Sequence, residues 1–210
     1  MTPNENPLFL NVLDFTAAVA AKSPTPGGGS VAGAVGALGT ALGHMSLNFT
    51  LGKKKYAEHQ EYLEHLAQRL NKSREMMERL VVEDMEAFKL YQETSSLPEG
   101  PEKAARMDTA TAAAVNVPRE LCKISLAVLE DFAVMSDGRC NRWLITDLMA
   151  GAALLSAVCS MCHYNVMVNT GSMSDKDTAR ELLQSSQNDV DKAKDLFQTV
   201  EKNGAAALGC

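Results

Sequence analysis

The sequence predicts an all-α protein that forms a single multihelical domain over residues 1–210. Hydrophobic residues make up 46% of the chain but aromatic residues only 5%, so Ala, Leu, Val and Met dominate, which suits closely packed helices. Apolar positions recur at helical spacing over long stretches, and no segment alternates as a convincing strand does. A chain of this length can bury a sizeable core.

Six stretches show the helical pattern. In chain order they cover about residues 7–22, 30–51, 57–94, 104–134, 144–169 and 175–203. The first begins with Asn6 as a cap and Pro7 in the first turn, and the segment SPTPGGG at 23–29 ends it. The second lacks charges, and the basic connection GKKKY at 52–56 ends it.

The later stretches differ in their faces and in how they end. The third is the longest, and the segment SSLPEGPEK with its two prolines follows it. Pro118 either kinks the fourth or divides it into two helices. MSDGRCNR at 135–142 separates the fourth from the apolar fifth, which GSMS at 171–174 ends. The last stretch is amphipathic and charged.

Two stretches, 23–52 and 148–174, carry no Asp, Glu, Lys or Arg and are long enough for a membrane span. They contain many small and polar residues and lack aromatic belts and basic flanks, so buried helices of a bundle are favoured over a membrane span. Glycines three or four residues apart between Gly29 and Gly43 let another backbone approach closely, within the chain or across a dimer.

Charge and cysteine usage exclude several functions. The net charge is -6 and no basic stripe is interleaved with aromatics, so nucleic-acid binding is not expected. The N-terminus MTPNENPLFL lacks a basic segment followed by an apolar one, so no signal peptide is expected. Scattered cysteines of odd number indicate a reduced, cytoplasmic protein. They are Cys122, Cys140, Cys159, Cys162 and Cys210.

A stripe along the third stretch contains a carboxylate. Its members are three or four residues apart and comprise Leu63, Leu66, Leu70, Ser73, Met77, Leu80, Asp84, Ala87 and Tyr91. A buried Asp84 must be paired, solvated or neutralised, because an isolated buried charge is very costly. A structural pairing and a functional site fit this pattern equally well, whereas Glu83 and Glu86 point away from the stripe and are expected to be solvated.

Other polar residues leave two interpretations open. Asp147 stabilises the start of the fifth helix or belongs to a site. Asn165 and Asn169, on the same face, bind a ligand or bridge helices. The lysines of GKKKY form a solvated corner or attract an anionic ligand. These lysines are Lys53, Lys54 and Lys55.

Three familiar motifs are excluded or weak. CSMCH at 159–163 matches a c-type haem attachment pattern, but it falls inside a helix, where Cys159 and Cys162 fit small core residues. A zinc site lacks a second Cys or His pair at suitable spacing. GGGS lacks the Lys of a phosphate-binding loop.

Several motifs occur together in a specific order. They are TPGGGS at 25–30, TLGKKKY at 50–56, DMEAF at 84–88, Asn141 followed by Thr146-Asp147, and NVMVN at 165–169. This set resembles the cyclodeaminase/cyclohydrolase family, over about residues 9–196. Members are the C-terminal domain of formimidoyltransferase-cyclodeaminase and stand-alone methenyltetrahydrofolate cyclohydrolases.

The resemblance implies an intertwined homodimer with long antiparallel helices that binds a reduced folate as substrate, without a metal or a redox cofactor. It implies that Asp84 is catalytic, and Lys55 is the lysine expected to hold water or carry the second proton. The implied substrate-binding residues are Gly27, Gly28, Gly29, Ser30, Lys53, Lys54, Asn141, Asp147, Asn165 and Asn169.

The expected reaction is hydrolysis of 5,10-methenyltetrahydrofolate to 10-formyltetrahydrofolate. The alternatives are a formimidoyltetrahydrofolate cyclodeaminase, which releases ammonia, and a diverged, non-catalytic folate-binding dimer. No formimidoyltransferase pattern lies within these 210 residues, which favours the cyclohydrolase. The chain has Cys140 where relatives commonly have Gly and Thr146 where they have Ser, and Arg142 and Trp143 are bulkier than usual. These departures bear on the local loop shape.

Overall fold

The computed structural model describes residues 6–209, and all regular elements of this part are helices, as the sequence predicts. In chain order they are η1 (Pro7–Phe9), α1 (Val12–Ala20), α2 (Gly28–Asn48), η2 (Lys54–His59), α3 (Gln60–Ser95), α4 (Pro101–Ser136), η3 (Arg142–Leu144), α5 (Ile145–Thr170) and α6 (Lys176–Leu208). The first half of the N-terminal segment MTPNENPLFL, residues 1–5, lies outside the described residues, as does the fifth cysteine, Cys210.

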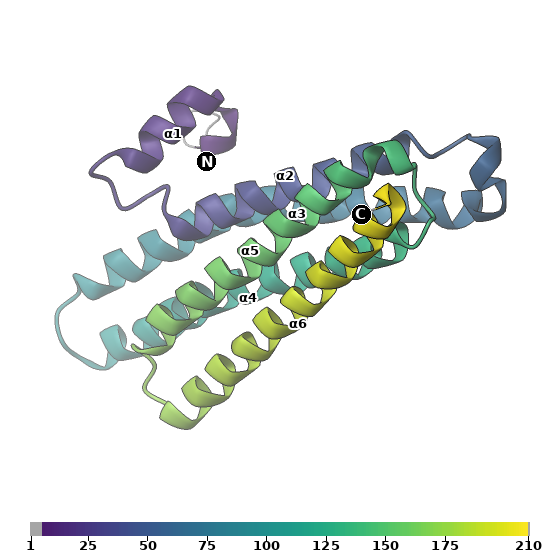
Figure 1. Ribbon diagram of the computed structural model, residues 1–210. Helices are drawn as coiled ribbons and strands as arrows, with labels where there is room; N and C mark the ends of the chain where they lie inside the picture. Colours follow the sequence, from purple (N-terminus) through teal and green to yellow (C-terminus); the bar gives the residue numbers. More distant parts are fainter. Residues whose placement is uncertain (1–5, 210) are drawn as a thin grey trace.

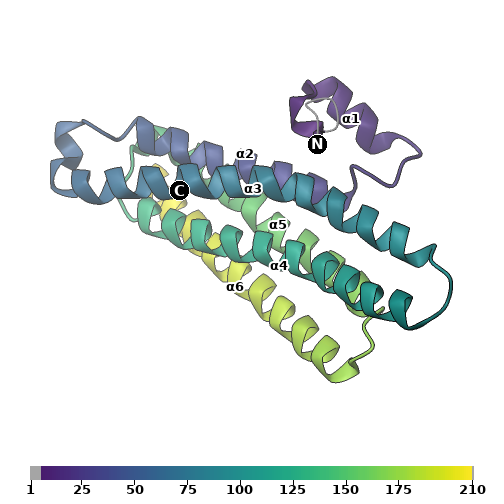
Figure 2. The ribbon, with the colours of Figure 1, turned by 180° about the vertical axis from the view of Figure 1, so that it is seen from behind.

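The helices α2 to α6 form one bundle, and α1 is set off from it beside α2 (Figure 1; Figure 2 shows the opposite side). The core consists of large side chains from the inner faces of the bundle helices, among them Leu47 of α2, Leu66 of α3, Phe132 of α4 and Leu155 of α5, each fully buried. Full burial of such a side chain contributes about 1.5–3 kcal/mol to stability. No residue of α1 is buried.

The apolar helices α2 and α5 touch through their backbones. A Cβ atom placed on Gly151 would lie 2.7 Å from the carbonyl oxygen of Gly39, and one on Gly39 would lie 3.0 Å from the carbonyl oxygen of Gly151. Side chains at these positions would push the helices apart. The glycine spacing therefore serves close packing within the chain, one of the two uses that the sequence predicts.

By length and composition alone, Gly28–Asn48 and Arg142–Thr170 are apolar enough to cross a membrane. Core helices of water-soluble bundles have the same length and composition. In this fold, 56% of the most apolar part of Gly28–Asn48 and 39% of that of Arg142–Thr170 are buried. Their place against each other in the bundle accounts for their composition without a membrane.

Helix α4 continues through Pro118, so of the two alternatives that the sequence leaves open, the division into two helices is excluded. Proline lacks the N–H that would bond the carbonyl four residues earlier, here that of Ala114. The side chain of Asn169 on α5 donates to this carbonyl oxygen at 2.6 Å. Packing against α5 thus satisfies the carbonyl that Pro118 leaves free, and the helix is maintained.

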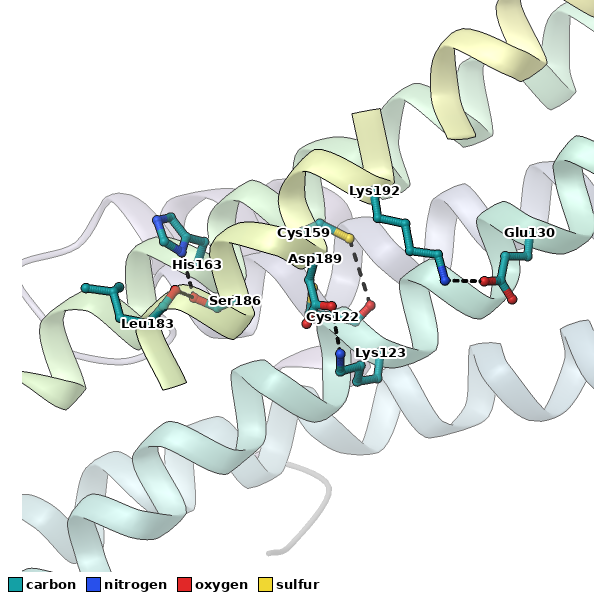
Figure 3. A network of polar contacts seen from close by, with 9 residues as sticks. All are labelled: Cys122, Lys123, Glu130, Cys159, His163, Leu183, Ser186, Asp189 and Lys192. Carbon is teal, nitrogen blue, oxygen red and sulfur yellow. Dashed lines mark hydrogen bonds and ion pairs between the residues drawn. The ribbon is translucent and has the colours of Figure 1, made fainter. Parts of the chain in front are cut away.

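Polar contacts fasten α6 across α4 and α5 (Figure 3). Lys123 Nζ lies 2.7 Å from Asp189 Oδ1, and Lys192 Nζ lies 2.6 Å from Glu130 Oε1. Exposed ion pairs of this kind contribute at most about 1 kcal/mol each to the stability of the fold. Their main effect is to fix the position of α6 along α4.

Cys159 and Cys162 are buried in the core, which confirms their interpretation as core residues. The Cys159 Sγ atom lies 3.9 Å from the carbonyl oxygen of Cys122 on α4 (Figure 3). Burial raises the pKa of the Cys162 thiol well above its ordinary value, so this thiol is neutral at physiological pH.

Candidate functional site

Asp84 lies on α3 against the first turn of α2. The Ser30 hydroxyl donates to Asp84 Oδ2 at 2.8 Å. A Cβ atom placed on Gly29 would lie 2.0 Å from Asp84 Oδ1 and 2.5 Å from its Cγ atom. The carboxylate therefore occupies the space that any other residue at position 29 would fill. The motifs TPGGGS and DMEAF are therefore in contact, through two residues, Ser30 and Asp84, that are 54 positions apart in the sequence.

The surroundings of Asp84 act on its pKa in opposite directions. Burial raises the pKa of the carboxyl, and the hydroxyl and backbone N–H of Ser30 partly oppose this rise by bonding the charged form. The first backbone hydrogen bond of α2 runs from the Val31 N–H to the Gly27 carbonyl. The N–H groups before Val31 have no partner within the helix, so this end of α2 has a positive electrostatic potential. The result is a carboxylate of increased basicity that still has donors for its charged form.

A cavity of about 340 Å³ opens beside Asp84 between α2, α3, α4 and α5. Its walls combine apolar and polar side chains. They comprise Pro24, Thr25, Gly27, Gly28, Gly29, Asp84, Ala87, Phe88, Tyr91, Thr111, Ala114, Val117, Asn165, Val168, Asn169 and Ser172. The volume is at the lower end of small-molecule sites and accommodates a bicyclic ring.

Asn165 and Asn169 project from α5 into this cavity, one turn apart. The Asn165 side-chain amide donates to the carbonyl of Met161 at 2.9 Å, and that of Asn169 donates to the carbonyl of Ala114. These bonds orient both amides. Within residues 6–209 neither Oδ1 atom has a hydrogen-bond partner, so the oxygens are free to accept bonds from a ligand. Bridging of helices and lining of a cavity, the two alternatives from the sequence, thus occur together at Asn169.

The remaining predicted site residues lie at the other end of the molecule. Lys53, Lys54 and Lys55 are exposed where α2 ends and η2 begins. Asp84 follows the first residue of α3 by 24 positions, which corresponds to about 36 Å along the helix axis. One chain therefore does not bring the lysines to Asp84.

Asn141 and Asp147 belong to the same distant end. Asn141 caps η3 by accepting from the Trp143 N–H at 3.3 Å, and its side-chain amide donates to the carbonyl of Phe49 at 3.4 Å. Asp147 is half-buried in the first turn of α5, the position that favours a carboxylate at a helix start. Trp143 is 80% exposed, so the bulkier segment lies on the surface and not in the cavity.

Several cavity residues were not among the predicted site residues. Phe88 and Tyr91 follow Asp84 by one and two turns of α3, so the helical spacing of the stripe could have indicated them. Thr111 lies in the small-residue run TATAAAV, where nothing in the sequence distinguishes it. Glu83 and Glu86 are exposed, as predicted.

The fold and the site define a class of protein: an all-α bundle with a small-molecule cavity around one partly buried carboxylate. Within residues 6–209, no group of three or more His, Cys, Asp or Glu residues is placed to hold a metal ion. Asp84 is the one carboxylate among the described residues that line this cavity.

Comparison with known proteins assigns the chain within this class. The formiminotransferase-cyclodeaminase family model matches residues 11–188, and the chain belongs to this family. It is 33% identical over 176 residues to a methenyltetrahydrofolate cyclohydrolase of Methylorubrum extorquens, covering 80% of this chain and 83% of that protein. It is 30% identical over 177 residues to the formimidoyltransferase-cyclodeaminase of Gallus gallus, covering 81% of this chain but only 32% of that protein.

A solved structure has the same fold. The crystal structure of a formiminotetrahydrofolate cyclodeaminase from Thermotoga maritima superposes with a TM-score of 0.86 at 26% sequence identity. The match covers 95% of this chain and 98% of that one. The resemblance of the ordered motifs to the cyclodeaminase/cyclohydrolase family is thereby confirmed.

Proposed function

We propose that the protein is a folate one-carbon enzyme that hydrolyses 5,10-methenyltetrahydrofolate to 10-formyltetrahydrofolate. The observation that carries this proposal is the Asp84 carboxylate, held by Ser30 at the wall of a cavity that accommodates a bicyclic ring. The similarity to a methenyltetrahydrofolate cyclohydrolase over most of both chains supports the choice of reaction.

Asp84 suits both steps of this hydrolysis. The methenyl bridge carries a positive charge, which a nearby carboxylate stabilises. Water adds to the bridge carbon and loses a proton to Asp84, whose raised pKa makes it a better base near neutral pH. The bond from the bridge carbon to N5 then breaks, N5 takes up one proton, and one proton is released overall.

The cyclodeaminase reaction is the second candidate, and the structural similarity to the Thermotoga maritima cyclodeaminase supports it. In this reaction N10 attacks the N5-formimidoyl carbon and ammonia leaves, which requires a proton donor. A carboxyl of raised pKa can also supply this proton. A diverged folate-binding dimer without turnover is the third candidate.

A direct assay separates these candidates. Purified protein receives 5,10-methenyltetrahydrofolate and, separately, 5-formimidoyltetrahydrofolate, and the methenyl absorbance is followed. We expect loss of absorbance faster than the spontaneous rate with the first compound. Gain of absorbance with release of ammonia from the second would assign the cyclodeaminase instead. Thermal stabilisation by tetrahydrofolate without turnover of either compound would leave only the binding protein.

The complete site is proposed to need two copies of the chain, as an intertwined homodimer with long antiparallel helices. Lys55 lies far from Asp84 within one chain, and antiparallel α3 helices of two copies would bring the two ends together. A groove of about 1520 Å³ lies between the η1–α1 segment and the helices α2 and α3, where apolar residues such as Val35 and Leu38 meet charged residues of α3, and Leu38 is 63% exposed. This groove is the proposed contact surface. Lys53 and Lys54 would then attract the glutamate tail of the folate, and Lys55 would serve the second proton.

Mixing two inactive variants tests this arrangement. Asp84→Asn and Lys55→Met proteins are each expected to be inactive, and unfolding and refolding them together should restore about a quarter of wild-type activity, because half of the dimers are mixed and one of their two sites is intact. Activity is measured before and after mixing, and the mass in solution is determined by light scattering. No recovery in a mixed dimer, or a monomeric mass, would contradict the two-copy site.

We propose that the protein acts in the cytoplasm, which a small-molecule folate substrate supports. Binding to nucleic acid or to a membrane is not part of the proposal.

A further inference from the structure

We infer that Thr111 positions the folate heterocycle in the Asp84 cavity by a hydrogen bond from its hydroxyl. Within residues 6–209, Thr111 Oγ1 is the one buried side-chain oxygen or nitrogen without a hydrogen-bond partner. The residue is only 4% exposed and lines the cavity. The inference rests on the proposed function, because it names the part of the substrate that this cavity holds.

Other buried hydroxyls of the bundle bond to the helix backbone. Thr170 donates to the carbonyl of Val166 at 2.7 Å, and Ser125 donates to that of Leu121 at 2.8 Å. The exposed Thr109, two positions before Thr111 on α4, likewise donates to the carbonyl of Ala105, at 3.2 Å. Thr111 makes no such bond. Buried polar groups are nearly always paired, so an unpaired hydroxyl in a cavity wall indicates a ligand atom as its partner.

Three polar side chains of the cavity contribute acceptors. Met161 orients the amide of Asn165, and the Ala114 carbonyl, which Pro118 leaves free, orients that of Asn169, so the oxygen of each amide is an unpaired acceptor. Asp84 contributes a carboxylate. Thr111 supplies a buried hydroxyl that can donate, beside the acceptors that Asp84, Asn165 and Asn169 contribute to the wall.

A reduced pterin ring matches this pattern. Its 2-amino group and N3–H are adjacent donors, which pair with the two asparagine oxygens, and its 4-oxo group is an acceptor, which pairs with the Thr111 hydroxyl. N5 is attached to the ring-fusion carbon C4a and lies on the same edge of the ring system as the 4-oxo group. In this pose the hydrogen bond from Thr111 to the 4-oxo group also fixes the position of N5, the reacting nitrogen. Apolar residues such as Phe88 and Val117 cover the faces of the pterin ring.

The test compares Thr111→Val, Thr111→Ser and the control Thr109→Val in the full-length protein. Tetrahydrofolate binding is measured by calorimetry, and the thermal midpoint is measured without ligand. Thr111→Val removes the hydroxyl with little change of shape, so the affinity should fall about threefold to tenfold and KM should rise with little change in kcat. Its ligand-free midpoint should equal or exceed that of wild type, because an unpaired buried hydroxyl is removed. Thr111→Ser should retain the affinity, and Thr109→Val should match wild type.

Two results would overturn the inference. Wild-type affinity in Thr111→Val would show that the hydroxyl does not bind the folate. A lower ligand-free midpoint in Thr111→Val, with Thr111→Ser restoring it, would show that the hydroxyl serves the fold. Absence of tetrahydrofolate binding by the wild type would overturn the proposed function as well, so the two failures are distinguishable.

Discussion

Replacement of Asp84 by Asn is expected to reduce turnover by about 10²- to 10⁴-fold while the protein remains folded. The amide keeps the size of the side chain and can accept the bond from Ser30, but it can neither take a proton nor stabilise the methenyl cation. The measurement is kcat for the reaction that the wild type performs, with circular dichroism as the check of folding. Glu64→Gln, an exposed position on the same helix, is the matched control and should leave kcat unchanged.

The same variant has a predicted effect on stability, and its sign follows from the pKa. Burial raises the pKa of Asp84 in the folded state above its value in the unfolded chain, so the charged form opposes folding. This destabilisation is fully present above the folded-state pKa and disappears as the pH falls below the unfolded-state pKa. The thermal midpoint of Asp84→Asn should therefore exceed that of wild type at neutral pH, and the difference should shrink as the pH falls to about 4. Wild-type turnover in Asp84→Asn would remove Asp84 from the mechanism, and a lower midpoint at neutral pH would make it a structural residue.

The fold could be predicted from sequence because its helices carry strong periodic signals. The stripe of α3 places Leu63, Leu66, Leu70, Met77 and Leu80 in the core as its spacing predicts. The N-terminal stretch is the weaker case. A new cap at Asn11, whose side chain accepts from the Asp14 N–H, separates η1 from α1 where the sequence predicts one helix.

Part of the site could be predicted because it consists of residues with unusual constraints. A carboxylate on an apolar stripe and a glycine run at a helix start both stand out, and the structure joins Asp84 to Ser30. Thr111 could not be predicted, because its significance is a missing partner, which exists only after α4 and the neighbouring helices pack. The role of Pro118 depends equally on contact with Asn169.

The distance between the lysines and Asp84 illustrates a different limit. The motifs TPGGGS, GKKKY and DMEAF form one set because they follow one another in the sequence. In the structure, however, GKKKY lies at the opposite end of α2 from TPGGGS. A straight helix of 21 residues separates its ends by about 30 Å. Motif order carries no information about this separation, and the proposed second copy of the chain would bring these motifs to one site.

Gly29→Ala is expected to lower activity about 100-fold with little loss of stability, since a misplacement of about 1 Å at reacting groups costs that much. The added methyl would lie 2.0 Å from Asp84 Oδ1 and 2.9 Å from Oδ2, closer than carbon and oxygen can approach, so the carboxylate must leave its place and its bond to Ser30. Position 29 is the second residue of α2, and Ala has the higher helix propensity, by at most about 1 kcal/mol, so this gain offsets part of the strain between α2 and α3.

The opposite effects on helix and site make Gly29→Ala informative. Kinetics with the preferred substrate, thermal unfolding and a crystal structure of the variant are the measurements. Gly100→Ala is the control, because a methyl there meets no atom within 4 Å. An equal loss of activity in both variants, or an active Gly29→Ala protein with Asp84 unmoved, would contradict the prediction. A displaced Asp84 in a stable, inactive protein would show that the second and third residues of α2 are glycine and serine because the catalytic carboxylate requires the space and the hydrogen bond.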